Sequence, residues 1–220
     1  MKRIDADSFI FKCKTVTPEE KKAEQDRRNR YSAQNALVAS GCPSRIIAAL
    51  AGLDETEPMR SARSFIESVR DEKWWLVMLG NVGSGKSTAA AWAARMLLFR
   101  LCLAEQPGGT HRERCRWLTG AELGRIYTHD RDMARDWEAL KRASVLVIDD
   151  LGTEGADSRS AEALWELVEA RTNNTWPTVL TSNLTASEFK KRYGERIADR
   201  IRSCSVILES RGVSLRGVVK

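Results

Sequence analysis

The sequence predicts an α/β fold of three layers, in which helices cover both faces of a mostly parallel five-stranded sheet. Two observations support this prediction. Apolar runs typical of buried strands alternate with segments whose apolar residues recur at helical spacing. One strand-to-helix turn, Gly80 to Thr88, also has the glycine spacing of a phosphate-binding loop. We expect a helical arm over residues 1–40 and the sheet domain over residues 41–220.

The arm begins with a clear helix signal. Thr17-Pro18-Glu19-Glu20 forms a capping box with proline at the first helical position, which predicts a helix from Pro18 to about Ser40. Its second half, with Ala33, Ala36, Leu37 and Val38, could dock on another surface that the sequence does not identify. Its first half is either solvated or a contact for DNA or a partner, through Lys21, Lys22, Arg27, Arg28 and Arg30.

The remaining elements follow in alternating order. Gly41-Cys42-Pro43-Ser44 breaks the first helix, and Ser44 is expected to cap a short helix that ends near Ala51. Thr119 to Glu122 and Thr185 to Glu188 predict two further helix starts. Strands are expected over residues 74–79, 114–118, 144–148, 175–181 and 204–208, and further helices over 57–70, 87–104, 158–171, 185–194 and 195–203.

Composition limits the class of protein. The formal charge of +6 favours a polyanionic partner such as a nucleic acid. The five cysteines have no Cys-x-x-Cys spacing, so we expect neither a zinc site nor a disulfide framework. The chain has no signal-peptide core and no apolar run of membrane length. We therefore expect a soluble, cytoplasmic protein without membrane contact.

The phosphate-binding loop carries the first chemical prediction. Its glycines let backbone N–H groups surround a polyphosphate, and the helix that follows points its positive end at the same group. Lys86 adds a positive charge, and Ser87 offers a hydroxyl to Mg²⁺. The predicted phosphate-binding residues are Gly80, Asn81, Val82, Gly83, Ser84, Gly85, Lys86, Ser87 and Thr88.

Two carboxylates end the apolar run from Val145 to Ile148, where α/β sheets form their ligand crevice. Asp149 is expected to hold Mg²⁺ through water, with Ser87 as the second metal-binding residue. Asp150 is then free to act as a general base or to orient a water that attacks the γ-phosphate. Asn183 ends the following strand and could hold the same water with its side-chain amide.

The helix near the carboxyl end is basic. Arg196, Arg200 and Arg202 lie on it, and Arg196 and Arg200, four residues apart, share one face. These arginines form either salt bridges with Glu195 or Asp199 or, as the family resemblance described below implies, an arginine finger that reaches into the ATP site of a neighbouring subunit.

Five segments, in this order, resemble the bacterial and phage DnaC/IstB-like branch of AAA+ ATPases, which covers helicase loaders and transposition helper ATPases. The resemblance spans roughly Ser40 to Arg216. The segments are Ala39 to Arg45, Gly80 to Thr88, Val147 to Gly152, Thr181 to Leu184, and Gly194 to Ile201.

The resemblance assigns roles to individual residues. It implies that Gly85, Lys86, Ser87 and Asp149 bind Mg²⁺-ATP and that Asp150 and Asn183 serve hydrolysis. Arg200 looks like the intersubunit finger, with Arg196 as second choice, and Arg216 resembles a residue that senses nucleotide in the same chain. By resemblance alone, the candidates for contact with single-stranded DNA are Arg125, Arg131 and Arg135, with Tyr127 or Trp137 for base stacking.

These implications give a leading hypothesis and three alternatives. The first is an oligomeric ATPase that loads a replicative DNA helicase onto single-stranded DNA, in a bacterial cell or a phage-infected host. The nearest alternative is a transposition helper that binds duplex DNA and directs a transposase. The others are a nucleotide kinase, against which the Asp149-Asp150 pair and Thr181-Ser182-Asn183 argue, and an ATP-switched adaptor with negligible turnover.

Overall fold

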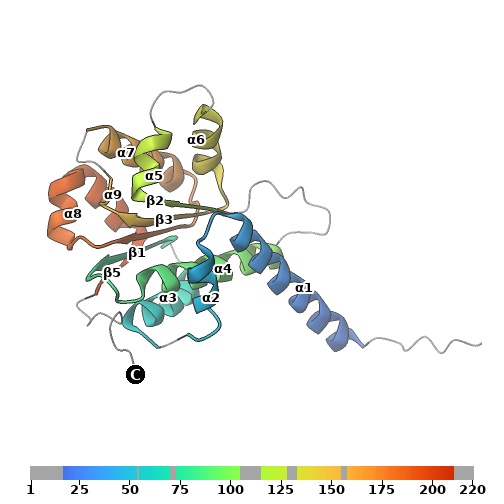
Figure 1. The fold of residues 1–220 in the computed structure, drawn as a ribbon. Helices are drawn as coiled ribbons and strands as arrows, with labels where there is room; N and C mark the ends of the chain where they lie inside the picture. Colours follow the sequence, from blue (N-terminus) through green and yellow to red (C-terminus); the bar gives the residue numbers. More distant parts are fainter. Residues whose placement is uncertain are drawn as a thin grey trace, which may run out of the picture.

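A computed structural model describes residues 17–53, 55–69, 73–104, 115–127, 133–154 and 158–210. Its centre is a five-stranded sheet in the order β2-β3-β4-β1-β5, and every pairing between neighbouring strands is parallel. The predicted sheet is therefore confirmed, with parallel pairing throughout (Figure 1). The strands are β1 (Trp75–Gly80), β2 (Cys115–Thr119), β3 (Val145–Leu151), β4 (Thr178–Ser182) and β5 (Ser205–Ser210).

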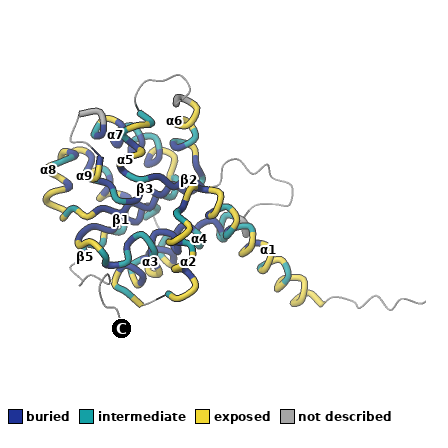
Figure 2. The backbone as a smooth tube through the Cα atoms, in the orientation of Figure 1, coloured by how far each residue is buried: buried dark blue, intermediate teal, exposed yellow. Residues whose placement is uncertain are grey.

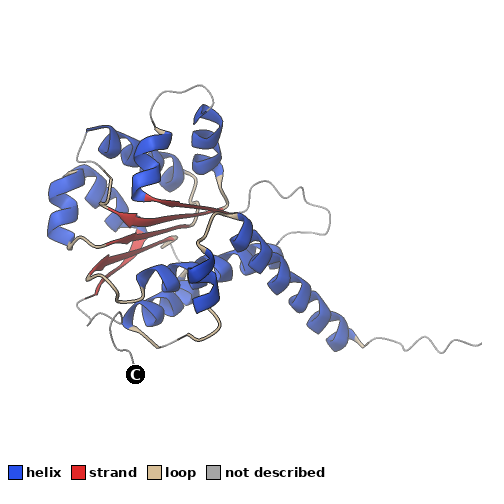
Figure 3. Cartoon of the chain, viewed as in Figure 1, coloured by secondary structure: helices blue, strands red, loops and turns tan. Residues whose placement is uncertain are grey.

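Helices cover both faces of the sheet, which gives the three predicted layers (Figure 3). None of the helices formed by the described residues has the length and apolar character needed to cross a bilayer. One face carries α1 (Pro18–Ala39), α2 (Ser44–Ala49), α3 (Glu57–Ser68) and α4 (Lys86–Ala104). The other carries α5 (Gly120–Ile126), α6 (Met133–Arg142), α7 (Ser158–Asn173), α8 (Ala186–Tyr193) and α9 (Glu195–Cys204).

The central strand β1 is apolar along its whole length because both faces of the sheet are covered there. On β1, Leu76 and Met78 face the core shared with α1 to α4, whereas Trp75, Val77 and Leu79 face the core shared with α5 to α9. All six residues of β1 are buried, and Figure 2 shows the same burial through the centre of the sheet. These two cores fix the carboxyl ends of the strands, where the predicted site residues lie.

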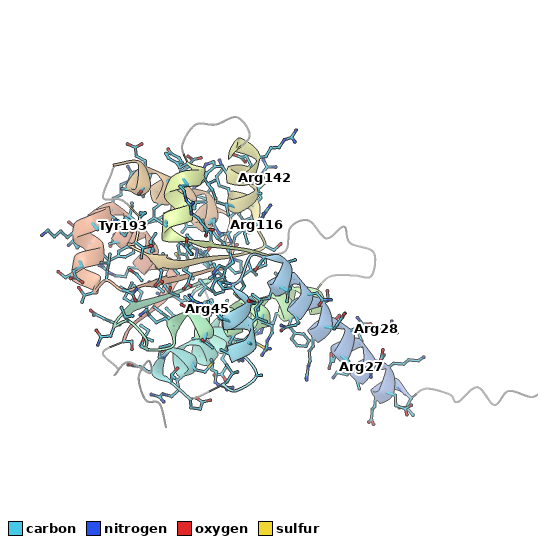
Figure 4. All side chains as sticks on the ribbon, in the orientation of Figure 1. Arg27, Arg28, Arg45, Arg116, Arg142 and Tyr193 are labelled. Atoms are coloured by element: carbon cyan, nitrogen blue, oxygen red, sulfur yellow. The ribbon has the colours of Figure 1, made fainter. Side chains whose placement is uncertain are left out.

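Helix α1 is half exposed and half packed (Figure 2). Its capping box at Thr17 is present as predicted, and Arg27 and Arg28 both pair with Glu24 on its exposed half (Figure 4). Ala33 and Leu37 are buried in the core that contains α4. Ala36 packs partly against the same core, so three of the four predicted docking residues contact the domain, whereas Val38 is exposed.

Two local predictions were wrong. Ser44 does not cap α2, because it is already the first helical residue and the carbonyl of Pro43 accepts from the N–H groups of Ile46 and Ile47. The strand bounds of 144–148 were too short for β3, although the strand does carry the two carboxylates near its end, as predicted. It continues to Leu151, because a register shift against β4 between Ile148 and Leu151 lets the strand pass through them.

Candidate nucleotide-binding site

The loop after β1 is anchored between two neighbouring strands. The N–H of Gly80 donates to the carbonyl of Leu184 over 3.0 Å, and the N–H of Asn81 donates to the carbonyl of Ser210 over 3.2 Å. Gly80 has a φ of +103°, and a Cβ at this position would lie 2.1 Å from the carbonyl oxygen of Ser210. Only glycine satisfies both conditions, so the first glycine of the motif is a packing requirement.

Lys86, the first residue of α4, turns back over the loop. Its Nζ donates to the carbonyl oxygens of Gly80 (2.8 Å) and Asn81 (2.7 Å) and to the side-chain oxygen of Asn183 (3.1 Å). The side chain is nearly buried, with the residue 5% exposed. This arrangement places the ammonium at the centre of the loop, next to the end of β4.

Asp149 is held from two sides. Its Oδ1 accepts from the hydroxyl of Ser87 over 2.8 Å and from the hydroxyl of Thr181 over 2.6 Å. Burial raises the pKa of the Asp149 carboxyl, and both hydroxyls counteract this shift by stabilising the charged form. The hydroxyl of Ser87 and the carboxylate of Asp149 are the hard oxygen donors that Mg²⁺ prefers, so the residues present fit this ion.

Asp150 adopts a left-handed backbone conformation, with a φ of +53°. Its N–H donates to the Thr181 hydroxyl over 2.9 Å, and its Oδ1 accepts from the Asn183 side-chain amide over 2.9 Å. Left-handed non-glycine residues are uncommon, although aspartate and asparagine tolerate the region best. The turn and the amide together direct the Asp150 carboxylate away from Asp149 and toward Asn183.

These groups line one cavity of about 450 Å³. Sequence reasoning missed its wall from α2, which supplies Arg45, Ile46 and Ala49 (Arg45 is labelled in Figure 4). The segment containing Arg45 was noted only for its family resemblance, because no spacing in the sequence connects it with the loop. The other lining residues are Val82, Gly83, Gly85, Lys86, Ser87, Thr88, Asp149, Asp150 and Asn183.

The arginines of α9 are not among the residues that line this cavity. Arg200 contacts the last turn of α7, and the guanidinium of Arg196 lies 3.8 Å from the ring centre of Trp165. The predicted salt bridges form in part: Arg202 pairs with Asp199, whereas Glu195 pairs with Lys190. Arg200 pairs instead with Glu169, over 3.6 Å. Arg216 lies outside the described residues.

The predicted DNA-contact residues are only partly described. Arg125 is on α5 and Arg135 is on α6, whereas Arg131 lies outside the described residues. The rings of Tyr127 and Trp137 pack edge to face, with centroids 5.0 Å apart. Trp137 also donates from Nε1 to the Glu166 carboxylate, so its ring is part of the packing between α6 and α7.

A buried carboxylate that sequence reasoning missed braces the turn after β3. Glu154 accepts from the Gly152 N–H over 2.8 Å, from Arg192 Nε over 3.3 Å and from the Tyr193 hydroxyl. Its side chain is 2% exposed. Burial is the main reason that the pKa of Tyr193, labelled in Figure 4, is raised. The network joins α8 to the segment that follows Asp150.

A parallel sheet in the order β2-β3-β4-β1-β5, with a phosphate-binding loop after β1 and acids on β3, defines a P-loop protein of the AAA+ fold. Residues 34–218 match the family described as IstB-like ATP binding protein. The chain belongs to this family. Among curated proteins, none matches it significantly.

Solved structures show the same fold. The crystal structure of DnaI superposes with a TM-score of 0.56 at 24% identity, covering 76% of this chain and 89% of the other. A putative primosome component from Streptococcus pyogenes serotype M3 has a TM-score of 0.52 at 22% identity, covering 73% and 81%. The DnaC helicase loader has a TM-score of 0.51 at 21% identity, covering 68% and 86%.

Proposed function

We propose that this protein is a Mg²⁺-dependent ATPase that assists DNA replication by loading a replicative helicase onto single-stranded DNA. The observation that carries the ATPase part of the proposal is a set of side-chain contacts in the cavity, in two groups that Thr181 joins by its contacts with Asp149 and Asp150. Lys86 contacts Asn183, Asn183 contacts Asp150, and Ser87 contacts Asp149. A site that only retained a nucleotide would not need the second carboxylate and its amide partner.

The residues divide between binding and hydrolysis. The loop N–H groups and Lys86 bind the phosphates, while Ser87 and Asp149 would hold Mg²⁺, which neutralises charge on the phosphates when bound. Asp150 accepts a proton from the attacking water or orients it, and Asn183 fixes the direction of the Asp150 carboxylate.

The ATP site is shared between subunits in this proposal. Arg200 serves as a finger in a homo-oligomer and stabilises transition-state charge on the γ-phosphate of the neighbouring subunit. Arg196 is the less favoured choice, because its guanidinium is stacked on Trp165. Arg216 would sense the nucleotide bound to its own chain.

The partners are proposed from two sources. Solved proteins of the same fold include the DnaC helicase loader and the replication initiator DnaA bound to AMPPCP and single-stranded DNA. The formal charge of +6 suits a nucleic-acid partner. Arg125, Arg131 and Arg135 are the candidate DNA contacts, and the proposed location is the cytoplasm.

Binding to DNA distinguishes this function from the nearest alternative. Fluorescence anisotropy with single-stranded and duplex DNA of equal length, at one fixed salt concentration, should show at least about tenfold tighter binding to the single strand when ATP is present. The Lys86→Ala protein should lose the ATP dependence, which controls for binding by charge alone. Tighter binding to the duplex would refute the loader and favour a transposition helper.

The helicase partner needs its own test. The replicative helicase of the native host should co-purify with the protein when ATP is present and should be loaded onto a circular single strand, measured as unwinding of an annealed oligonucleotide. Unwinding that does not change on addition of the protein would refute helicase loading while leaving ATP hydrolysis intact.

A further inference from the structure

We propose that Thr172 and Asn173, in the last turn of α7, are positioning residues for Arg200. This inference rests on the proposed shared ATP site. It names the part of each subunit that orients the finger toward its neighbour.

Three side chains of α7 meet the guanidinium. Arg200 Nε donates to the Thr172 hydroxyl over 3.1 Å, and one terminal nitrogen donates to the Asn173 side-chain oxygen. The Glu169 carboxylate lies 3.6 Å from Nε. Three side chains from the last five residues of α7 therefore converge on one arginine.

The acceptor on Thr172 is fixed. Its hydroxyl donates to the carbonyl of Val168 over 2.7 Å, so its proton points into the helix and a lone pair faces Arg200. Thr172 is only 8% exposed, which further restricts its rotamer. Asn173, in contrast, is exposed and reaches the guanidinium from the surface.

These contacts leave part of the guanidinium available. Arginine has five N–H donors, and the two bonds to α7 occupy the Nε side of the plane. Within the described part of the chain, the other terminal nitrogen makes no hydrogen bond, and the side chain is 41% exposed. A guanidinium held along one side, with a second pair of donors in solvent, is prepared for bidentate contact with a phosphate.

The turn that holds Arg200 is rigid, because its neighbour Arg171 is fully buried. Arg171 donates to the carbonyls of Leu140, Ala143 and Pro177 and to the Thr178 hydroxyl. Burial lowers the pKa of Arg171 to about 9, which keeps it charged at neutral pH. It joins the end of α6, the last turn of α7 and the start of β4 in one framework.

The place of Arg200 in the fold suits action on another subunit. Helix α9 leads into the start of β5, where Ser205 is in register with Trp75 at the start of β1. The phosphate-binding loop follows the opposite end of β1. A six-residue strand separates these two edges of the sheet by about 17 Å. Arg200 therefore lies toward the edge opposite its own loop.

The test compares hydrolysis by point variants of the full chain under conditions in which it oligomerises. Asn173→Ala and Thr172→Val should each lower kcat for ATP by about 10- to 100-fold with KM unchanged, because a misplaced group costs on this scale and the finger acts only in the transition state. Asn173→Asp and Thr172→Ser keep an oxygen acceptor and should restore most of the rate. Asn174→Ala is the matched control, since Asn174 contacts the carbonyl of Ala170 instead of Arg200.

Mixed oligomers separate a misplaced finger from a damaged subunit. Lys86→Ala subunits lack phosphate binding but carry an intact Arg200, so adding them should restore hydrolysis by Asn173→Ala subunits, as it should for Arg200→Ala subunits. One outcome overturns the positioning role and leaves the shared site standing. In that outcome, hydrolysis recovers in the mixture that contains Arg200→Ala subunits, but the Asn173→Ala and Thr172→Val proteins hydrolyse ATP as fast as the Asn174→Ala control. If the Arg200→Ala mixture does not recover, both the shared site and the positioning role are overturned.

Discussion

Replacing Asp150 with asparagine tests the hydrolytic part of the site with little disturbance to the fold. Asparagine tolerates the left-handed conformation that Asp150 adopts, and its side-chain oxygen can still accept from the Asn183 amide. The Asp150 N–H keeps its bond to the Thr181 hydroxyl, because that bond is made by the backbone. The substitution therefore removes the charge and little else.

The substitution is expected to slow only the chemical step of ATP hydrolysis. A positioned general base contributes about 10²- to 10⁴-fold, which corresponds to roughly 3–5 kcal/mol of barrier. We expect Asp150→Asn to lower the rate of phosphate release by this factor. The Kd for ATP should change by less than about twofold, because Lys86, Ser87 and Asp149 are untouched.

Single-turnover release of phosphate, measured beside equilibrium binding of a fluorescent ATP analogue, separates the two quantities. Asp150→Ala is the informative companion, because alanine in the left-handed region costs about 1–2 kcal/mol and should lower Tm as well as the rate. Phosphate release by Asp150→Asn at the parent rate would refute the reasoning. The protein would then fit an ATP-switched adaptor better than an ATPase.

Two further predictions concern stability. Arg171→Met should lower the free energy of unfolding in urea by about 2–4 kcal/mol, because each buried acceptor left without a donor costs about 1–3 kcal/mol; a loss below about 1 kcal/mol would show that the carbonyls find other donors. Glu154→Gln should lower the free energy of unfolding, measured by thermal unfolding, by about 1–3 kcal/mol. The glutamine amide cannot accept hydrogen bonds from the donors of Gly152, Arg192 and Tyr193 as the carboxylate does. An unchanged Tm would contradict that account.

The phosphate-binding loop was predictable because its functional residues are consecutive in the sequence. The spacing from Gly80 to Ser87 requires a strand before it and a helix after it, and the sequence supplies both. The acids of β3 and the asparagine that directly follows β4 were predictable for a related reason. Parallel strands bring their carboxyl ends to one edge of a sheet, so adjacent strands place their final residues together.

Residues that reach the site from distant elements were not predictable. Arg45 lines the cavity from α2, and Glu154 is buried between α5 and α8. Arg171 appears in the sequence as an ordinary basic residue near a helix end, yet the structure surrounds it with carbonyls from two other segments. Such roles depend on how elements pack, and neither periodicity nor spacing records that.

The accuracy of the predicted helix starts depended on whether a capping box was present. Thr17, Thr119 and Thr185 all cap helices as predicted, because each has a glutamate three residues later that bonds back to it. Ser44 has no such partner, and the chain enters α2 through Pro43 instead. The continuation of β3 past Asp149 depends on a register shift, which is a property of two strands together.

The packing of Gly80 has a consequence for how the motif should be read across related chains. Because the carbonyl of Ser210 occupies the space of a side chain at Gly80, selection on β5 alone would preserve this glycine in a relative that no longer bound ATP. The presence of Gly80 in a related chain therefore indicates only that β1 and β5 pack in the same way. The presence of Lys86 and Asp150 indicates the proposed phosphate binding and hydrolysis. The same contact makes β5 and the loop a single mechanical unit, so a displacement of the loop would be passed directly to Ser210 and β5.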